Sequence, residues 1–348
     1  MSNDLFSLAL LFTVILISGC NSTQHTQTIT PLNARPEISL SREREDRILA
    51  LEPDRVTERE VRELLAPGPA PRIVNIHGGI YPVYLVMESF SEFLLGMGYP
   101  ETSVRHPGDG SYSFSCYENS EKIAGTIAWY YENEGLRPLI VGHSQGGIQA
   151  VKVLHELAGN FATRIPVWNP MTGKKEQRYE IREPLTGKLV TVVGLQVSYA
   201  TAVGAGGLTR ILPNQWKMMK KLRKVPDSVV EFTGFYMGMD LLGGDLMGFG
   251  SGNLFKPNGH ARVRNVRLPT GYNHFNVPAT KHLLESRQII EWIYNYTPSE
   301  EPRLEVEFDS DSSHILWAAD VWHSIKKHWV LELQRVINAK RDRNHANG

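Results

Sequence analysis

Apolar and polar positions in the first half of the chain follow a pattern that predicts strands and helices in alternation. Short apolar runs at 72–76 and 139–141 have the length and composition of buried strands, and a further strand is expected at 102–105. Segments 83–95 and 118–134 carry apolar residues at helical spacing. Sequential strand–helix–strand units of this length build a parallel sheet with right-handed crossovers, so the pattern predicts an α/β fold.

The second half of the chain continues the alternation less regularly. Residues 228–236 and 261–268 are expected to form strands, and 278–293 a helix. Segment 168–193 contains a Pro-x-Thr-Gly-Lys turn twice, which predicts a β-hairpin insertion. A long amphipathic helix is expected over 313–339, either covering the sheet or lying on a membrane surface. Acidic residues interrupt its polar face, which favours packing on the domain.

The N-terminus contains a charge-free apolar run, residues 5–17, with the length of a signal-peptide core. The run ends in Ile-Ser-Gly before Cys20, which resembles the lipobox of bacterial lipoproteins. The resemblance implies a signal peptide over 1–19 and a lipidated N-terminus and tether over 20–40. Because Asn21 follows the cysteine, it also implies outer-membrane sorting in the cell envelope, facing the periplasm. An uncleaved anchor and an ordinary cleaved signal are the alternatives, since no Lys or Arg precedes the run.

Composition adds limits on function and organisation. The 348 residues contain 37 Lys and Arg against 37 Asp and Glu, a balance that gives no support for nucleic-acid binding. Cys116 would be the one cysteine besides the lipidated one, and its surroundings suit a small half-buried residue better than a nucleophile. We expect a helical lead-in over 41–70 that is interrupted at Pro53, a catalytic domain over 71–298, and a C-terminal helical extension over 299–348.

The strongest chemical signal is the motif Gly-His-Ser-Gln-Gly, with Ser144 at its centre. The motif lies between the apolar run at 139–141 and a helical segment at 148–157. A serine on such a strand–turn–helix connection has a strained backbone, and a β-carbon two positions away would clash. Gly142 and Gly146 meet that steric need, so the sequence predicts Ser144 as a nucleophile.

A second glycine-rich turn, His-Gly-Gly at 77–79, follows the predicted strand at 72–76. Together the two motifs strongly resemble the α/β-hydrolase family. The resemblance implies a central, mostly parallel sheet with helices on both faces, and chemistry that needs no metal or organic cofactor. It also implies that the backbone amides of Gly79 and Gln145 hold an oxyanion. Because no pair of antiparallel strands is evident before Arg72, the family's first two strands are not expected.

A serine nucleophile needs a base to accept its proton and a carboxylate to orient that base. The family's chain order is serine, acid, histidine. His274 follows the predicted strand at 261–268 and a loop at 269–273, and it precedes a helical segment, so it is the predicted base. His143 is expected to pack inside the motif and shape the pocket. Other histidines look like surface or helix positions or precede a strand: His106, His155, His260 and His282.

Two aspartates compete for the role of the acid. Asp240 and Asp245 both follow the predicted strand at 228–236, and both precede two apolar residues and a glycine. Asp240 lies closer to the strand end and is the predicted acid, with Asp245 as the alternative. Segment 234–255 would suit a flexible apolar acyl pocket or an ordinary packed loop. Segment 205–219 would suit a lid or core packing.

These residues predict a serine hydrolase, tethered to a membrane through Cys20, that acts on a small-molecule or lipid ester. Ser144 would attack the carbonyl, His274 would act as base, and Asp240 would orient His274. One alternative is acyl transfer by the same three residues. The other is a catalytically idle hydrolase fold that serves as a binding protein of the cell envelope. The choice of an ester rests on the resemblance, since the family carries several hydrolase activities on one scaffold.

Overall fold

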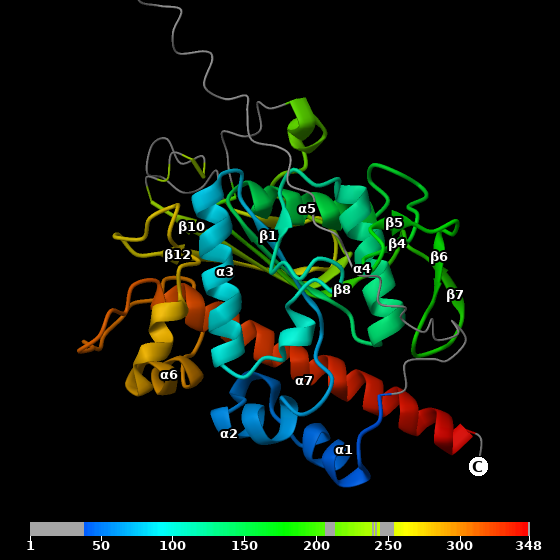
Figure 1. The fold of residues 1–348 in the computed structure, drawn as a ribbon, viewed down its shortest axis with the longest axis horizontal. Coiled ribbons are helices and arrows are strands. Elements are labelled where there is room, and N and C mark those ends of the chain that lie inside the picture. Colours follow the sequence, from blue (N-terminus) through cyan, green and yellow to red (C-terminus); the bar gives the residue numbers. More distant parts are fainter. Residues whose placement is uncertain (1–37, 206–212, 239, 241, 244–253, 347–348) are drawn as a thin grey trace, which may run out of the picture. The chain divides into compact units, whose positions relative to one another are not determined.

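The computed structural model describes residues 38–205, 213–238, 240, 242–243 and 254–346, and its centre is a six-stranded sheet (Figure 1). Every pair of neighbouring strands in the sheet is parallel, which confirms the predicted α/β class. The strand order is β12–β10–β8–β3–β1–β2. The strands are β1 (Ile73–His77), β2 (Phe114–Ser115), β3 (Leu139–His143), β8 (Val197–Val203), β10 (Val229–Met237) and β12 (Arg262–Leu268).

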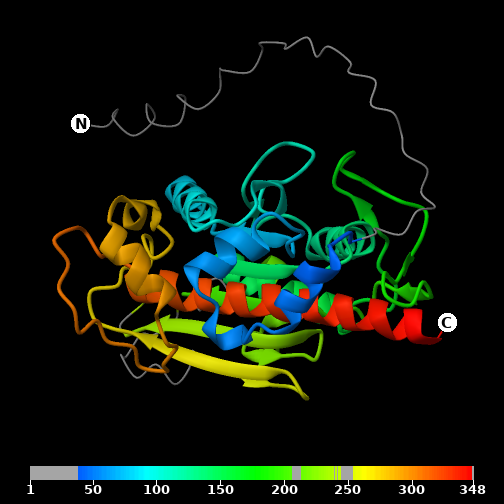
Figure 2. The ribbon, with the colours of Figure 1, turned by 90° about the horizontal axis from the view of Figure 1, so that it is seen from below.

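Helices cover both faces of this sheet (Figures 1 and 2). One face packs against α3 (Tyr81–Gly96), α6 (Arg287–Tyr294) and α7 (Ile315–Ala346). The other packs against α4 (Ser120–Glu134) and α5 (Gln145–Leu157). Because the central strands β3 and β8 are covered on both sides, their successive residues enter different cores.

Strand β3 shows the consequence for the sequence. Leu139 and Val141 belong to the core beneath α3 and α7, whereas Ile140 between them belongs to the core beneath α4 and α5. All five residues of the strand are buried. The continuous apolar run that predicted this strand is therefore explained by burial on both faces.

The lead-in and the C-terminal helix pack together on one side of the sheet. The lead-in consists of α1 (Arg42–Leu49), the 3₁₀ turn η1 (Pro53–Arg55), α2 (Glu58–Glu60) and the π-helical turn η2 (Val61–Leu65). Figure 2 shows α7 running lengthwise across the molecule beside these turns. Three tryptophans of α7 are fully buried in the core that includes the lead-in and the sheet: Trp317, Trp322 and Trp329. The expected packing of this helix on the domain is confirmed.

The predicted insertion is also confirmed, as two short antiparallel hairpins. The first pairs β4 (Trp168–Asn169) with β5 (Lys174–Lys175), and the second pairs β6 (Glu180–Arg182) with β7 (Leu189–Thr191). Each hairpin turns at one of the two Pro-x-Thr-Gly-Lys sequences. A separate parallel pair joins β9 (Lys224–Val225) to β11 (Lys256–Pro257).

Two sequence predictions about strands need correction. The strand expected at 102–105 is wrong, because the 3₁₀ turn η3 (Glu101–Ser103) lies there and Val104 is buried without entering the sheet. The edge position belongs instead to β2, which has only two residues and so leaves almost no periodic signal. Strand β8 was not predicted, although it lies in the middle of the sheet. Its small and hydroxylated residues, such as Ala200 and Thr201, conceal a strand whose seven residues are all buried.

The helix expected over 278–293 is divided. The 3₁₀ turn η7 (Lys281–Glu285) comes first, and α6 begins after Ser286, whose side chain accepts a hydrogen bond from the Ile289 amide. An N-terminal cap of this kind satisfies an amide that has no partner within the helix. Another 3₁₀ turn, η5 (Pro213–Met218), lies in the segment considered as a lid. Within the described residues, no helix is both long and apolar enough to cross a membrane.

Candidate active site

Ser144 lies on the sharp connection between β3 and α5, with φ 55° and ψ −124°. Its amide donates a hydrogen bond of 2.9 Å to the carbonyl of Val203, at the end of the neighbouring strand β8. A β-carbon on Gly142 would lie 2.5 Å from the Gly146 carbonyl oxygen, and one on Gly146 would lie 2.1 Å from that of Ile76. Neither distance is physically possible, which confirms the steric reason for glycine on each side of the serine.

The hydroxyl of Ser144 begins a chain of hydrogen bonds. Its Oγ lies 2.7 Å from Nε2 of His274, and Nδ1 of His274 lies 2.9 Å from Oδ2 of Asp240. Both His274 and Asp240 are buried, and the Gly243 amide donates to the other carboxylate oxygen, Oδ1, at 2.8 Å. The structure thus brings together the three residues that the sequence singled out. Asp245, the alternative acid, lies outside the described residues.

The sheet explains why residues so distant in sequence meet. Ser144 follows β3, Asp240 follows β10 and His274 follows β12 through a short loop. All these strands are parallel, so their carboxyl ends share one edge of the sheet, where ligands of open α/β sheets bind.

His143 has a positioning contact that the sequence did not reveal. Its side chain is fully buried, and its Nε2 lies 2.6 Å from the backbone carbonyl of His274, to which it donates. Burial first, and the neighbouring His274 ring second, lower the pKa of His143 to about 3. The ring is therefore neutral, and it holds the loop that carries His274. This agrees with the expectation that His143 packs inside the motif.

Gly79 and Gln145, the expected oxyanion donors, lie beside each other. A β-carbon on Gly79 would come within 2.7 Å of Oε1 of Gln145. Gln145 is the first residue of α5, so its amide has no partner within the helix and lies at the positive end of the helix dipole. The carbonyl of Gly79 accepts a hydrogen bond of 3.0 Å from the Tyr117 hydroxyl, which ties the loop after β1 to the segment after β2.

Exposed apolar side chains border the site. Ile80 follows Gly79 and is 51% exposed, Phe275 follows His274 and is 40% exposed, and Leu242, two residues after Asp240, is also 40% exposed. All three follow a residue of the candidate site by one or two positions along the chain, so apolar surface is open close to the site in sequence.

Two other residues considered in the sequence, His155 and Cys116, have surroundings that suit a structural role. His155, expected at a surface or helix position, is in a helix but buried, where its ring contacts Asn160 and the Lys221 carbonyl. Cys116 is buried, and burial raises the pKa of its thiol to about 12, so it carries no thiolate near neutral pH. In the described part of the chain, no group of three or more His, Cys, Asp or Glu side chains could hold a metal ion.

Several expectations fall outside the described residues. They are the signal peptide at 1–19, the lipidation site Cys20 and nearly all of the tether at 20–40. The segments at 205–219 and 234–255, considered as a lid and an acyl pocket, are described only in part.

The chain was compared with models of protein families, with curated proteins and with solved structures, and no match was found in any of the three.

Proposed function

We propose that this protein is a serine hydrolase of the α/β-hydrolase type that cleaves carboxylic esters. The observation that carries the proposal is the hydrogen-bonded chain from Ser144 through His274 to Asp240, which begins at a serine with a strained backbone. The position of Ser144 after the third parallel strand supports the assignment to this fold. In this assignment the sheet lacks the family's first two strands.

The first half of the reaction forms an acyl-enzyme. His274 donates from Nδ1 to Asp240, so its Nε2 is free of hydrogen and can accept the Ser144 proton. As the proton moves, Oγ attacks the ester carbonyl carbon, and the negative charge on the carbonyl oxygen is held by the amides of Gly79 and Gln145. Loss of one such donor typically lowers kcat about 10²–10³-fold. His274 then gives its proton to the leaving alcohol oxygen as the bond between that oxygen and the carbonyl carbon breaks, which completes the acyl-enzyme.

The second half returns the enzyme to its starting state. Water then loses a proton to His274 and attacks the acyl carbon, and Ser144 leaves with that proton. Asp240 keeps its charge throughout and stabilises the imidazolium that forms twice.

The apolar border of the site supports an acyl portion with hydrophobic character. Ile80, Leu242 and Phe275 are exposed beside the three reacting or oxyanion-holding positions. Covering them with an alkyl chain removes apolar surface from water, at about 25 cal/mol for each Å² covered.

Attachment to the cell envelope is part of the proposal, and it rests on the sequence around Cys20. Radiolabelled palmitate should enter the wild-type protein in a bacterial host, and the protein should fractionate with membranes. Cys20→Ser should abolish both. Labelling that persists in the variant would contradict lipidation at this residue.

The test of the hydrolase is the cleavage of p-nitrophenyl esters of increasing chain length by the full-length protein in detergent. Ser144→Ala and His274→Ala should each reduce kcat to near background, because each removes an essential part of one proton-transfer system. Ser310→Ala and His345→Ala change exposed residues and serve as matched controls. Ester cleavage that survives Ser144→Ala would refute the proposed nucleophile.

A second readout separates failure of the site from a wrong substrate. Wild-type protein should react with a fluorophosphonate at Ser144, and His274→Ala should not. If the wild type neither labels nor cleaves esters, the fold is catalytically idle. If adding an alcohol or amine diverts the acyl group from water, the reaction is acyl transfer.

A further inference from the structure

A cavity of about 510 Å³ lies at the carboxyl ends of β1 and β2, and the mechanism above does not use it. One wall comes from the hairpin β4–β5, including Trp168, Asn169 and Thr172. Another part of the lining comes from the segment after β2 and the start of α4, including Glu118 and Lys122, whose Nζ lies 5.7 Å from the centre of the Trp168 ring. A volume of this size can enclose a small organic group such as a monosaccharide.

The cavity adjoins the candidate active site through the loop after β1. His77 lines the cavity, and the next residue, Gly78, packs so closely on Ser144 that a β-carbon there would lie 3.0 Å from the serine Cβ. On the β2 side, Ser115 lines the cavity, and Tyr117, two residues further, donates to the Gly79 carbonyl. The loop after β1 is therefore shared by the cavity, through His77, and the candidate active site, through Gly78 and Gly79.

The lining combines polar side chains with apolar ones such as Phe114, Trp168 and Met171, and its charges have partners. Lys122 and Glu118 form an ion pair of 2.8 Å. Asp109 lies at the rim with its side chain 70% exposed, and it accepts hydrogen bonds from the amide and hydroxyl of Ser111. A purely alkyl ligand would displace water from the polar groups without replacing its hydrogen bonds. A ligand with a net charge would meet charged side chains that already have partners.

His77 gives the lining a defined hydrogen-bond acceptor. Its Nδ1 lies 2.7 Å from the Gly78 carbonyl oxygen, which can only accept, so Nδ1 carries the hydrogen. Burial is the main cause of a lowered pKa for His77, which keeps the ring neutral at pH 7. Nε2 is then an acceptor for a hydroxyl. Ser115 Oγ accepts from the Tyr117 amide, which leaves its own hydrogen to donate.

We propose that this cavity binds the alcohol portion of the ester substrate, and that this portion is neutral and carries several hydroxyl groups, as in a sugar or a polyol. Hydroxyls both donate and accept hydrogen bonds, so they match the polar part of the lining, which includes His77, serines and the side-chain amide of Asn169. Trp168 offers an apolar edge for the carbon skeleton of the ligand. The proposal rests on the proposed function, in which the alcohol oxygen of the ester takes a proton from His274 and the alcohol portion leaves as the free polyol. The apolar border of the site would hold the acyl chain.

The first experiment blocks the cavity from its exposed side in the full-length protein. Thr172→Trp adds bulk to a lining residue at the tip of the hairpin, and Lys174→Trp adds the same bulk to an exposed residue of the same hairpin outside the lining. With a glucose monoester and the methyl ester of the same fatty acid as substrates, Thr172→Trp should lower kcat/KM for the glucose ester at least tenfold. The methyl ester should change less than twofold, and Lys174→Trp should change neither.

Equal loss on both substrates with normal fluorophosphonate labelling, or no loss on either, would overturn the proposal. A monoacylglycerol as a third substrate separates the two sources of hydroxyls. A loss confined to the glucose ester indicates a sugar site, and a loss on both hydroxylated esters indicates a site for polyols in general.

The second experiment is independent of catalysis. Methyl glucoside and glycerol are titrated into full-length Ser144→Ala protein and followed by ligand-observed NMR. We expect saturable binding of at least one of them, which Thr172→Trp removes and Lys174→Trp retains. If the protein cleaves no ester yet binds in this way, the proposed hydrolysis fails and the cavity remains a site for hydroxylated ligands. No saturable binding of either compound would overturn the cavity assignment even if esters are cleaved.

Discussion

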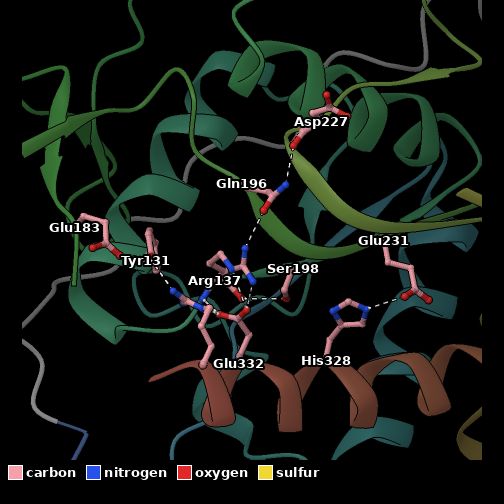
Figure 3. Close-up of polar contacts among 10 residues, drawn as sticks. Tyr131, Arg137, Glu183, Gln196, Ser198, Asp227, Glu231, His328 and Glu332 are labelled. Atoms are coloured by element: carbon pink, nitrogen blue, oxygen red, sulfur yellow. Dashed lines mark hydrogen bonds and ion pairs between the residues drawn. The ribbon is translucent and has the colours of Figure 1, made fainter. Parts of the chain in front are cut away.

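Asp240–His274 and Glu231–His328 are both carboxylate–histidine pairs of low exposure, yet their surroundings differ in kind. In the first pair, Oδ2 lies 2.9 Å from Nδ1, and the other ring nitrogen contacts Ser144. In the second, shown in Figure 3, Oε2 of Glu231 in β10 lies 3.6 Å from Nε2 of His328 in α7. That distance is too long for a hydrogen bond. The His328 ring stacks on Tyr199, with 5.2 Å between ring centroids.

The second pair is one of several polar contacts that hold α7 on the sheet. Glu332, fully buried, accepts hydrogen bonds from the side chain and the amide of Arg137, which precedes β3, and from Arg335 one turn along the helix (Figure 3). Arg264 of β12 forms a similar pair with Asp320 of α7. These carboxylates connect α7 to the central sheet, and the remaining contacts between the two are mainly apolar packing.

The two regions differ in the elements that carry the partners. Around α7 the partners lie in helices and strands or, for Arg137, directly before a strand, and the pairs hold the helix in one position on the sheet. At the candidate active site the partners lie on loops at the edge of the sheet, and the chain of hydrogen bonds ends on a serine hydroxyl. Around α7, buried charges with matched partners hold the helix on the sheet. At the candidate active site, the buried pair would support proton transfer from Ser144 in the proposed reaction.

Asp240→Asn should give the largest effect that separates the two regions. An amide cannot hold His274 with its hydrogen on Nδ1, so kcat should fall about 10⁴-fold with little change in thermal stability. Single-turnover ester cleavage and thermal denaturation measure the two quantities. A loss smaller than tenfold would indicate that another carboxylate orients His274, and Asp245→Asn tests the sequence alternative directly.

Glu332→Gln should do the opposite: it should lower the stability of the fold and leave kcat nearly unchanged. The variant leaves Arg137 and Arg335 without their shared anion in a buried position, which should cost about 3–5 kcal/mol in the free energy of unfolding. Urea denaturation gives that value. Glu305→Gln, at an exposed position, is the matched control. The folded fraction of Glu332→Gln should keep its kcat, and a large fall in kcat per folded molecule would contradict the separation of the two regions.

Acid should weaken the α7 region through Glu231. Burial alone would raise the pKa of this carboxyl, but His328 and Lys327 outweigh it and lower the pKa to about 2, against an ordinary value of 4.5. A lowered pKa stabilises the fold above pH 4.5, and the stabilisation, about 3 kcal/mol at most, is lost as the pH falls toward 2. Wild type should therefore lose stability relative to Glu231→Gln between these values. Parallel stability curves for the two proteins would contradict this assignment.

Tyr272→Phe should give the smallest effect, because it removes a single hydrogen bond between the two regions. The Leu316 amide, at the start of α7, donates to the Tyr272 hydroxyl at 3.0 Å, two residues before His274. Removing the acceptor should cost about 1 kcal/mol of stability and lower kcat less than tenfold by loosening the histidine loop. Comparing kcat with KM tests this, since a positioning contact should change kcat and leave KM nearly constant.

Local features of the sequence were sufficient to predict the sharp connection between β3 and α5 that carries Ser144. Two glycines, an apolar run and a helical segment occupy adjacent positions, and the steric need that they meet is set by bonds within a few residues. The strands β1, β3, β10 and β12 were also predicted, since burial on both faces produces a continuous apolar run, as in β3, and burial on one face produces alternation, as in β12. Strands β2 and β8 were missed because a two-residue edge strand and a strand of small residues leave no periodic signal.

The chemistry of single residues and the class of fold could therefore be inferred from local sequence. The α/β alternation follows from local periodicity, and Ser144 and His274 could be proposed from the segments that flank them. The contact of Asp240 with His274, the hold of His143 on the histidine loop and the cavity at the ends of β1 and β2 are visible only in the folded chain. These relations join residues that are 34 to 131 positions apart or come from separate elements. The distances are set by how parallel strands and covering helices pack, which no local pattern encodes.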